Sequence, residues 1–584
     1  MKAARVDPAR DATLRRLKAV PEISVLIVGG GINGAGTFRD LALQGVDCLI
    51  VDKADWCAGT SAAPSRLIHG GLKYLETGEF RLVAESTRER NLLLRNAPHL
   101  VKALPTVVPI HAYFSGIVPA TKRFLGFKAK LAQRGLLIVE LGLALYDWLG
   151  RRHRIMPRHS IALRAATRRR FPAMAPSVVA TSTYYDARVT QAERLVLELV
   201  MDGEAANPDA RALNYMAVTG TSGAGVTLVD QVTGDTVTVK PRIVINAAGP
   251  WIDRVNQAFG LDRTYIGGTK GGHLVVDNPD LVRQLDGHMI YFGSSDGRIC
   301  LVYPFFGKAL IGSTDIKADV PDDVVCDDAE ADYMLDMVRE VFPGLPLTRD
   351  QIVYRYAGIR PLPAAQVEDP GEISRDHSVG RDTLPGSAAL HGSAVPVLSL
   401  IGGKWTTFRA LATEVTDMAL AAVGRPRRTD TTFVPIGGGR GFPTSDEARR
   451  AWIARVAATN AVSPARAGTC LDRYGTEAEA ILQARDGGTD DALECLPDYG
   501  AGELRAVIRR EQVVDLTDLV FRRLPIAVSG RLTREAVTEI GALAAEALYW
   551  SDDERERQIA NLCRIALERH GIDVHGGVNA LRTA

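Results

Sequence analysis

A glycine-rich turn between two apolar segments is the part of this sequence best suited to chemistry. The string GGGING occupies residues 29–34, directly after the apolar run 23–28, and a second apolar run, 48–51, ends at Asp52. A buried strand, a glycine turn, a helix and a second strand that ends in an acidic residue describe a dinucleotide-binding βαβ unit. The order of these elements indicates a nucleotide cofactor site.

Each glycine has a physical role in such a turn. Gly29 permits the tight bend, Gly31 lets the backbone approach a pyrophosphate, and Gly34 lets the helix lie close to the strand. The helix N-terminus offers N–H groups and the positive end of a dipole to phosphate oxygens. Asp52 stands where it can accept a ribose hydroxyl. The turn alone does not separate FAD from NAD.

The elements that must position this turn extend over most of the chain. An α/β pattern covers about residues 23–104, and strand signals at 211–218, 225–229 and 236–245 resemble the antiparallel meander that interrupts many flavin-binding folds. Residues 265–356 read as a further β-rich sheet, and 397–423 repeat the strand, glycine turn and helix. Beyond the glycine-rich linker 435–443 the apolar spacing predicts helices.

Composition narrows the class of protein. The chain has 584 residues, 46% of them hydrophobic and 24% charged, which predicts two or three globular domains. A formal charge of +1 argues against nucleic-acid binding. Seven scattered cysteines without a CxxC pair suggest reduced thiols in a cytosolic protein rather than a disulfide framework or a zinc site. Residues 1–22 lack an apolar core, so we interpret them as a short leader and not a signal peptide.

One segment suggests contact with a membrane. The apolar stretch 135–148 contains Glu140 and Asp147 and is shorter than the ~20 residues that a spanning helix needs. Basic and aromatic residues precede it at 122–134, and arginines follow it at 151–154. This mixture is typical of a helix lying in a membrane surface, and equally of a core helix with a solvated basic face.

Eleven segments of the chain resemble one known family, the FAD-dependent glycerol-3-phosphate dehydrogenases and their oxidase relatives. They are VGGGINGAG (28–36), TS (60–61), SRLIHGGLKYLE (65–76), EFRLV (79–83), LYD (145–147), NAAGPW (246–251), KGGH (270–273), GSTD (312–315), GIRPL (358–362), SRD (374–376) and GGKWTT (402–407). They follow the family's order, and the helical tail with RYG (473–475) is similar to the family's C-terminal domain.

The resemblance implies an α/β (α+β) flavoprotein. Its FAD-binding Rossmann-like domain would be of the glutathione-reductase/D-amino-acid-oxidase type, joined to a β-rich substrate domain and a helical C-terminal domain. The expected boundaries are 1–22 for the leader, 23–112, 156–264 and 351–430 for the three parts of the FAD-binding domain, 113–155 for the membrane-associating segment, 265–350 for the substrate domain and 431–584 for the helical domain.

The resemblance also implies a reaction and its residues. Oxidation of sn-glycerol 3-phosphate to dihydroxyacetone phosphate would proceed by hydride transfer from C2 to N5 of FAD, and the electrons would pass to a membrane quinone. The implied FAD contacts are Gly29, Gly31, Gly34, Asp52, Thr60, Ser61, Gly249, Gly403, Lys404 and Thr406. The implied catalytic residues are His69, Arg360 and Lys270, and the implied substrate contacts are Lys73, Tyr74, His273, Arg375 and Ser399. His69 is the preferred base, because imidazole titrates near neutrality, and His273 is the alternative.

One departure from the family leaves alternatives open. Lys73 stands where the family commonly has arginine, and a lysine offers the substrate phosphate a point charge instead of a bidentate fork. The alternatives are a related polyol phosphate such as erythritol phosphate as substrate, O2 as acceptor, a flavin-binding scaffold without turnover, and an NAD-dependent dehydrogenase.

The expected partners are glycerol 3-phosphate, a quinone and an anionic membrane surface, with a homodimer left open. The expected location is cytoplasmic, peripheral on the inner face of the membrane.

Overall fold

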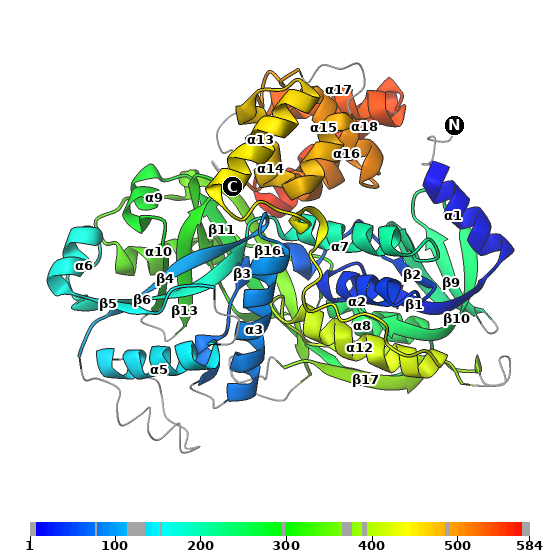
Figure 1. Cartoon of the computed structure of the whole chain (residues 1–584), viewed down its shortest axis with the longest axis horizontal. Helices are drawn as coiled ribbons and strands as arrows, with labels where there is room; N and C mark the ends of the chain where they lie inside the picture. Colours follow the sequence, from blue (N-terminus) through cyan, green and yellow to red (C-terminus); the bar gives the residue numbers. More distant parts are fainter. Residues whose placement is uncertain are drawn as a thin grey trace.

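Two β-sheets and a helical C-terminal domain make up the described part of the chain, as expected for this type of flavoprotein (Figure 1). The computed structural model describes residues 8–75, 79–113, 135–151, 155–222, 225–294, 298–318, 320–364, 376–387, 394–484 and 491–574, without the side chains of Lys73 and Tyr74.

The first sheet carries the predicted βαβ unit. Its parallel strands run in the order β18 (Pro396–Ile401), β10 (Thr236–Asn246), β1 (Glu22–Val28), β2 (Cys48–Val51) and β7 (Arg211–Leu213), with β17 (Ser378–Thr383) antiparallel at the edge. The predicted meander is confirmed, because β8 (Met216–Ser222) pairs with β9 (Gly225–Asp230) and β9 with β10.

Strand β1 is buried on both faces. Val25 and Ile27 pack against helices on one face, namely α2 (Ile32–Leu43), α7 (Ala192–Ala206) and α12 (Phe408–Val423). Leu26 and Val28 pack on the other face with residues of the meander. Because successive side chains of a strand point to opposite faces, a continuous apolar run is what a strand between two layers requires.

The expected leader is wrong for the part of it that the structure describes. Residues 8–19 form helix α1 (Pro8–Ala19), and Leu14 and Leu17 are buried against the meander. The guanidinium of Arg10 is also buried and lies 2.8 Å from Asp230. The polar composition concealed this helix, because one of its inward side chains is an arginine with a buried acidic partner.

The second sheet is larger than the predicted substrate domain. Its strands run in the order β15 (Ile316–Lys317), β11 (Ile266–Val276), β14 (Lys308–Gly312), β13 (Ile299–Phe305), β12 (Met289–Gly293), β4 (Val101–Ile110), β6 (Ala180–Val189) and β3 (Leu67–Ile68), with β16 (Ile352–Pro363) on β11 and β5 (Ser160–Leu163) on β6. Our boundaries placed β3, β4, β6 and β16 in the FAD-binding domain. The long-range pairing of β4 with β6 and of β16 with β11 assigns them to the second sheet instead.

The two faces of this sheet have different neighbours. Leu274 and Val276 pack with α9 (Pro279–Leu285) and α10 (Asp328–Val341). Val275 belongs to the cluster that joins this sheet to the C-terminal helices. Those helices are α13 (Asp446–Asn460), α14 (Pro464–Tyr474), α15 (Ala478–Gln483), α16 (Ala501–Arg510), α17 (Arg534–Leu548) and α18 (Asp552–His570), which lie above both sheets in Figure 1.

Helix α5 (Leu136–Leu149) lies at the lower left of Figure 1, below β6. Val139, Leu143 and Tyr146 point inward, whereas Leu137, Leu141, Ala144 and Trp148 are exposed at the i, i+4, i+7 and i+11 spacing of one helical stripe. Residues 114–134 and 152–154 of the predicted membrane-associating segment lie outside the described residues. No helix in the described ranges has the length and apolarity to cross a bilayer.

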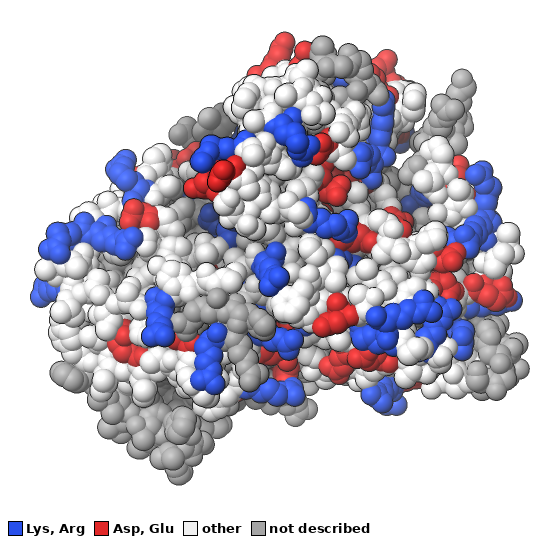
Figure 2. Space-filling view, in the orientation of Figure 1, with Lys and Arg blue, Asp and Glu red and all other residues white. Residues whose placement is uncertain are grey.

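Charge is mixed over most of the face drawn in Figure 2, in keeping with the small net charge. Basic side chains gather at its left end, where α6 (Arg164–Arg170) ends in Arg168, Arg169 and Arg170.

Candidate functional site

The glycine turn between β1 and α2 has the close packing that the sequence predicts. A Cβ on Gly34 would lie 1.9 Å from the carbonyl oxygen of Gly29, and a Cβ on Gly29 would lie 2.5 Å from the carbonyl oxygen of Ala247. Gly29 also has a φ of +112°, which L residues avoid. Glycine is therefore required at both positions for β1, α2 and the end of β10 to pack this closely.

Asp52 faces back toward this turn. Its carboxylate accepts hydrogen bonds from the backbone N–H of Gly30 at 2.6 Å and of Ala54 at 2.9 Å. Burial raises the pKa of Asp52 to about 6, although both N–H donors favour the ionised form. The carboxylate is ionised at neutral pH and can accept a further hydrogen bond from a ribose hydroxyl.

A second turn, between β18 and α12, lies beside the first. A Cβ on Gly403, whose φ is +94°, would lie 2.9 Å from Nδ2 of Asn33 in α2. Trp405 donates a hydrogen bond from Nε1 to the carbonyl oxygen of Ser61, and the hydroxyl of Ser61 accepts one from the N–H of Ile32. These contacts bring the predicted cofactor residues of both turns together. Gly249, with a φ of +57°, follows β10 and has open space where a Cβ would lie.

The segment 60–65 joins this cofactor region to the second sheet. Thr60 donates its hydroxyl to the carbonyl oxygen of Ile359 at 2.6 Å. The hydroxyls of Tyr356 and Tyr303 donate to the carbonyl oxygens of Pro64 and Ser65, each at 3.0 Å. The segment 60–65, which contacts both cofactor turns through Ser61, therefore also packs against one face of the second sheet at strands β13 and β16.

Arg360 and His273 lie on that face. In the β11–β16 register, Arg360 pairs with Thr269, Gly358 with Gly271 and Tyr356 with His273. A Cβ on Gly271 would lie 2.2 Å from the guanidinium of Arg360, and a Cβ on Gly358 would contact Ala63 and Thr60. Arg360 is held by Asp315 at 2.9 Å and by the hydroxyl of Ser313 and the carbonyl oxygen of Thr314, each at 3.2 Å.

The imidazole of His273 is buried and held in place. Its Nε2 lies 2.8 Å from the hydroxyl of Ser65, and its ring stacks on Tyr356 at 4.9 Å. Burial, together with the positive charges of Arg360 and Arg66, lowers the pKa of His273 to about 3. A histidine in this environment is a weak base near neutral pH.

Lys270 lies on the opposite face of the sheet, contrary to the prediction that it shares a site with Arg360. It pairs with Ile359 in the register, one residue out of phase with Arg360. Its Nζ lies 2.7 Å from Glu330 and 3.4 Å from Asp327, the two carboxylates that cap α10. Lys270 therefore anchors α10 to the sheet and does not face the cofactor turns.

Ser399 does not reach the site either. It is fully buried in β18, where its hydroxyl contacts the side-chain amide of Asn256 at 3.1 and 3.3 Å, so the prediction that it contacts the substrate is wrong. Lys73 and Tyr74 follow His69 in a short 3₁₀ helix, Leu72–Leu75, but their side chains lie outside the described residues, as does all of Arg375.

His69 lies at the entrance to this 3₁₀ segment and is half-buried. Its backbone N–H donates to the hydroxyl of Thr406 at 3.2 Å, which places it against the second glycine turn. Lys404 belongs to the same turn. The structure thus places His69 against Thr406, and it places Ile359, the residue before Arg360, against Thr60 of the segment that leads to His69.

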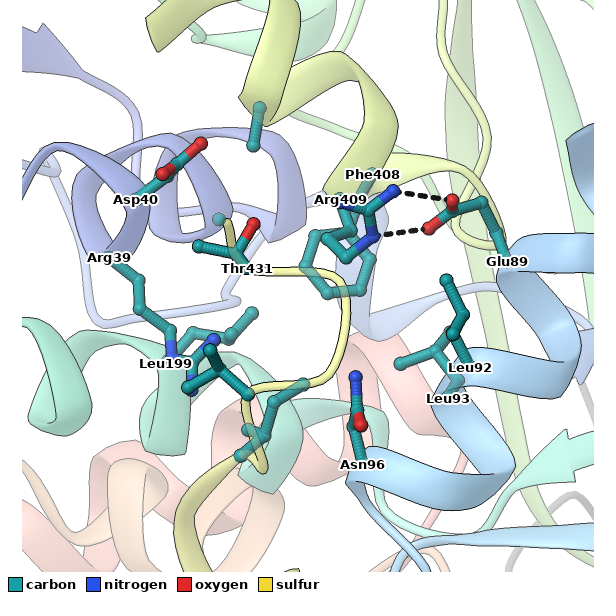
Figure 3. A pocket seen from close by; sticks show the side chains of 14 residues that line it. Arg39, Asp40, Glu89, Leu92, Leu93, Asn96, Leu199, Phe408, Arg409 and Thr431 are labelled. Atoms are coloured by element: carbon teal, nitrogen blue, oxygen red, sulfur yellow. Dashed lines mark hydrogen bonds and ion pairs between the residues drawn. The ribbon is translucent and has the colours of Figure 1, made fainter. Parts of the chain in front are cut away.

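A separate pocket lies between α2, α3 (Phe80–Asn96), α7, α12 and residues 431–436 (Figure 3). Its charged side chains are already paired, because Arg409 forms two hydrogen bonds with Glu89 and Arg39 bonds to Asp202. None of the predicted site residues lines it. We therefore do not assign the cofactor to this pocket.

Two glycine turns, an acidic residue after β2 and a second β-sheet packed beside them are typical of a dinucleotide-dependent oxidoreductase. A model of the family described as FAD-dependent oxidoreductases matches residues 24–407, and one described as the C-terminal domain of alpha-glycerophosphate oxidase matches residues 429–555. The chain belongs to the FAD-dependent oxidoreductase family.

Relatives match over nearly the whole chain. A glycerol-3-phosphate dehydrogenase of Synechocystis sp. is 32% identical over 93% of this chain and 97% of the relative. One of Pseudomonas tolaasii is 29% identical over 86% and 92%. The solved glycerol-3-phosphate dehydrogenase from Bacillus halodurans, complexed with FAD, has the same fold, with a TM-score of 0.71, 23% identity and coverage of 97% and 98%.

The chain's residues fit FAD, its family's cofactor. The turn at Gly29, Gly31 and Gly34 leaves backbone, not side chains, against a pyrophosphate, and Asp52 would accept from the ribose. The second turn, with Gly403 and its neighbours, would lie near the isoalloxazine ring, where a helix N-terminus stabilises negative charge.

Proposed function

We propose that this chain is a glycerol-3-phosphate dehydrogenase that oxidises sn-glycerol 3-phosphate to dihydroxyacetone phosphate and delivers the electrons to a quinone. The observation that carries the proposal is the contact of His69 with Thr406 at the second glycine turn, and the hydrogen bond from Thr60 to Ile359, the residue before Arg360, supports it. The names of the full-length relatives support the choice of substrate.

In the proposed reaction His69 takes the proton of the C2 hydroxyl while the C2–H bond breaks and a C2=O bond forms. FAD, when bound, supplies the two-electron acceptor for the hydride. Arg360 is a fixed cation that can stabilise the developing charge on the C2 oxygen, because Asp315, the hydroxyl of Ser313 and the carbonyl oxygen of Thr314 hold its guanidinium in place.

We assign the base to His69 rather than to His273. The low pKa of His273, about 3, makes it a poor proton acceptor at neutral pH, and its Nε2 is engaged by Ser65. His69→Ala should lower the rate of flavin reduction by a factor on the order of 10²–10⁴ with FAD retained. An unchanged rate would remove His69 from the reaction.

The test of the reaction is an anaerobic absorption spectrum of the purified holoenzyme before and after each of three compounds. Bleaching of the flavin by sn-glycerol 3-phosphate, and not by glycerol, supports the proposal. Equal or faster bleaching by erythritol phosphate would transfer the assignment to that substrate and point to Lys73. Mixing the reduced enzyme with a quinone analogue or with air then separates a dehydrogenase from an oxidase.

We propose that α5 attaches the enzyme to the surface of the membrane that holds the quinone. Its exposed stripe is entirely apolar, with Leu141 73% and Trp148 55% exposed, and Arg151 lies 4.7 Å from the Trp148 ring. Apolar side chains flanked by cations suit the interface of an anionic bilayer.

Sedimentation with anionic vesicles tests this attachment of α5 to the membrane. Leu141→Glu should reduce the bound fraction severalfold, and binding should weaken as salt rises. Leu567→Glu is the matched control, because Leu567 is an exposed apolar residue of α18 in the C-terminal domain. Equal binding of both variants would refute a role for the stripe.

A further inference from the structure

A buried cluster of three polar side chains stands directly behind Gly70, the residue that follows His69. The hydroxyl of Tyr146, on α5, accepts a hydrogen bond from the N–H of Gly70 at 2.9 Å. It donates to Asp186 on β6 at 2.6 Å, and it accepts from Arg90 on α3 at 2.8 Å. Asp186 also accepts from the Gly70 N–H at 3.1 Å and from Arg90 at 2.8 Å.

These contacts use the full capacity of the Tyr146 hydroxyl. A phenol has one O–H donor and two acceptor lone pairs, and Asp186, Gly70 and Arg90 occupy all three. The side chains of the cluster are nearly inaccessible, with Arg90 6% and Asp186 2% exposed, so water does not compete for these bonds. Burial also raises the pKa of Tyr146 well above its ordinary value, which keeps the donor proton in place.

The packing around Gly70 leaves little freedom. A Cβ on Gly70 would lie 2.3 Å from the Tyr146 hydroxyl and 2.4 Å from Cγ2 of Thr87. On its other side, the N–H of His69 donates to Thr406. Two consecutive backbone N–H groups are thus held by different parts of the protein, one by the second glycine turn and the next by the Tyr146 cluster.

We propose that Tyr146, supported by Asp186 and Arg90, is a positioning residue that fixes the backbone of His69 and Gly70 against the second glycine turn. This inference rests on the proposed role of His69 as the base. It accounts for the LYD segment at 145–147, whose role the sequence alone does not indicate. Tyr146 holds the active-site loop, while Asp147 on the same helix binds the ring of His159 at 2.8 Å.

Removing the hydroxyl leaves the Gly70 N–H with only its longer bond, to Asp186. Proton abstraction is sensitive to small displacements of the base, with losses on the order of 100-fold for about 1 Å. In the holoenzyme, Tyr146→Phe should lower the rate of flavin reduction at saturating glycerol 3-phosphate about 10- to 100-fold. The substrate dissociation constant should change less than about threefold, because the hydroxyl of Tyr146 bonds to Gly70, Asp186 and Arg90, which lie behind the loop.

The matched control is Tyr184→Phe. Tyr184 is a buried neighbour whose ring meets that of Tyr146 edge-on at 5.7 Å, and its loss of a hydroxyl should leave the reduction rate within about twofold. Hydrogen exchange adds a readout without substrate: peptides covering residues 67–72 should exchange faster in Tyr146→Phe than in the wild type or the control.

The outcomes separate this inference from the proposed function. If glycerol 3-phosphate does not reduce the wild-type flavin, the proposed function fails, and hydrogen exchange still decides the role of Tyr146. If the wild type is active but Tyr146→Phe matches Tyr184→Phe in rate and exchange, the positioning role is wrong. Should Tyr146→Phe not fold, fast exchange of the Gly70 amide in the wild-type holoenzyme would overturn the proposal.

Discussion

Replacing Lys270 by methionine should destabilise the protein without slowing flavin reduction. The Lys270 ammonium lies 2.7 Å from Glu330, whose side chain is only 3% exposed. Methionine leaves the Glu330 carboxylate with the hydroxyl of Thr314 and the N–H of Asp327 as its remaining donors. Breaking a buried ion pair by removing one partner costs about 3–5 kcal/mol. Because Lys270 is 15% exposed, we expect a value near the lower end, about 3 kcal/mol.

The assay combines denaturant unfolding with stopped-flow reduction of the flavin. Lys270→Met should lower the unfolding midpoint and leave the reduction rate within about threefold, since Lys270 faces α10. Adding Glu330→Gln should restore much of the stability, because the unpaired buried charge is then removed. Arg360→Met, on the cofactor face, should lower the reduction rate about 10²- to 10³-fold. A folded Lys270→Met protein that retains FAD and is slowed more than tenfold would refute the assignment of faces.

Three further predictions concern the cofactor turn and buried titrating groups. Gly34→Ala should yield protein without bound FAD, because the new Cβ would lie 1.9 Å from a carbonyl oxygen, and the flavin-to-protein absorbance ratio measures this loss. The control is Gly142→Ala, where the new Cβ meets nothing within 4 Å. FAD should dissociate more readily as pH falls below about 6, where Asp52 becomes protonated, and Asp52→Asn should flatten this dependence in a filtration assay. The pKa of His273 is about 3 in the folded protein and about 6.5 in the unfolded chain, so protonation of this residue favours the unfolded state. The folded state is therefore favoured most above pH 6.5, and its stability decreases as pH falls from 6.5 toward 3. Between pH 6.5 and 4, the free energy of unfolding of the wild type should therefore fall by up to about 3 kcal/mol more than that of His273→Gln, as measured by denaturant midpoints.

The parts of the fold predicted correctly from sequence are those whose signals are local. The apolar run of β1, the glycine turn and Asp52 lie within about thirty residues. The meander strands β8, β9 and β10 follow one another along the sequence in the same order in which they pair in the sheet. The second sheet was only partly predicted because strand β4 pairs with β6, about eighty residues later. An apolar strand signal near residue 104 is the same whether the strand joins the first sheet or the second.

The error at Lys270 has a similar cause. A segment such as KGGH indicates that a strand reaches the site, but the face of each side chain depends on the partner's register. Once Thr269 is known to oppose Arg360, the alternation of a strand places Lys270 on the other face. The two α10 capping carboxylates that receive Lys270 lie about sixty residues away, so the nearby sequence contains no sign of them.

The glycines of the site are visible in the sequence, whereas the role of the side chains behind them is not. A glycine turn is required by the backbone itself, since Gly29 and Gly34 have no room for a Cβ, and such a requirement is visible in the residue type. Tyr146 and Asp186 both accept from the N–H of Gly70, and Arg90, on a third element, donates to each of them. Asp186 and Arg90 read alone are ordinary strand and helix residues, and the LYD segment does not indicate what Tyr146 contacts. Only the fold shows that they converge, so the position that we propose for His69 depends on contacts between residues that lie far apart in the sequence.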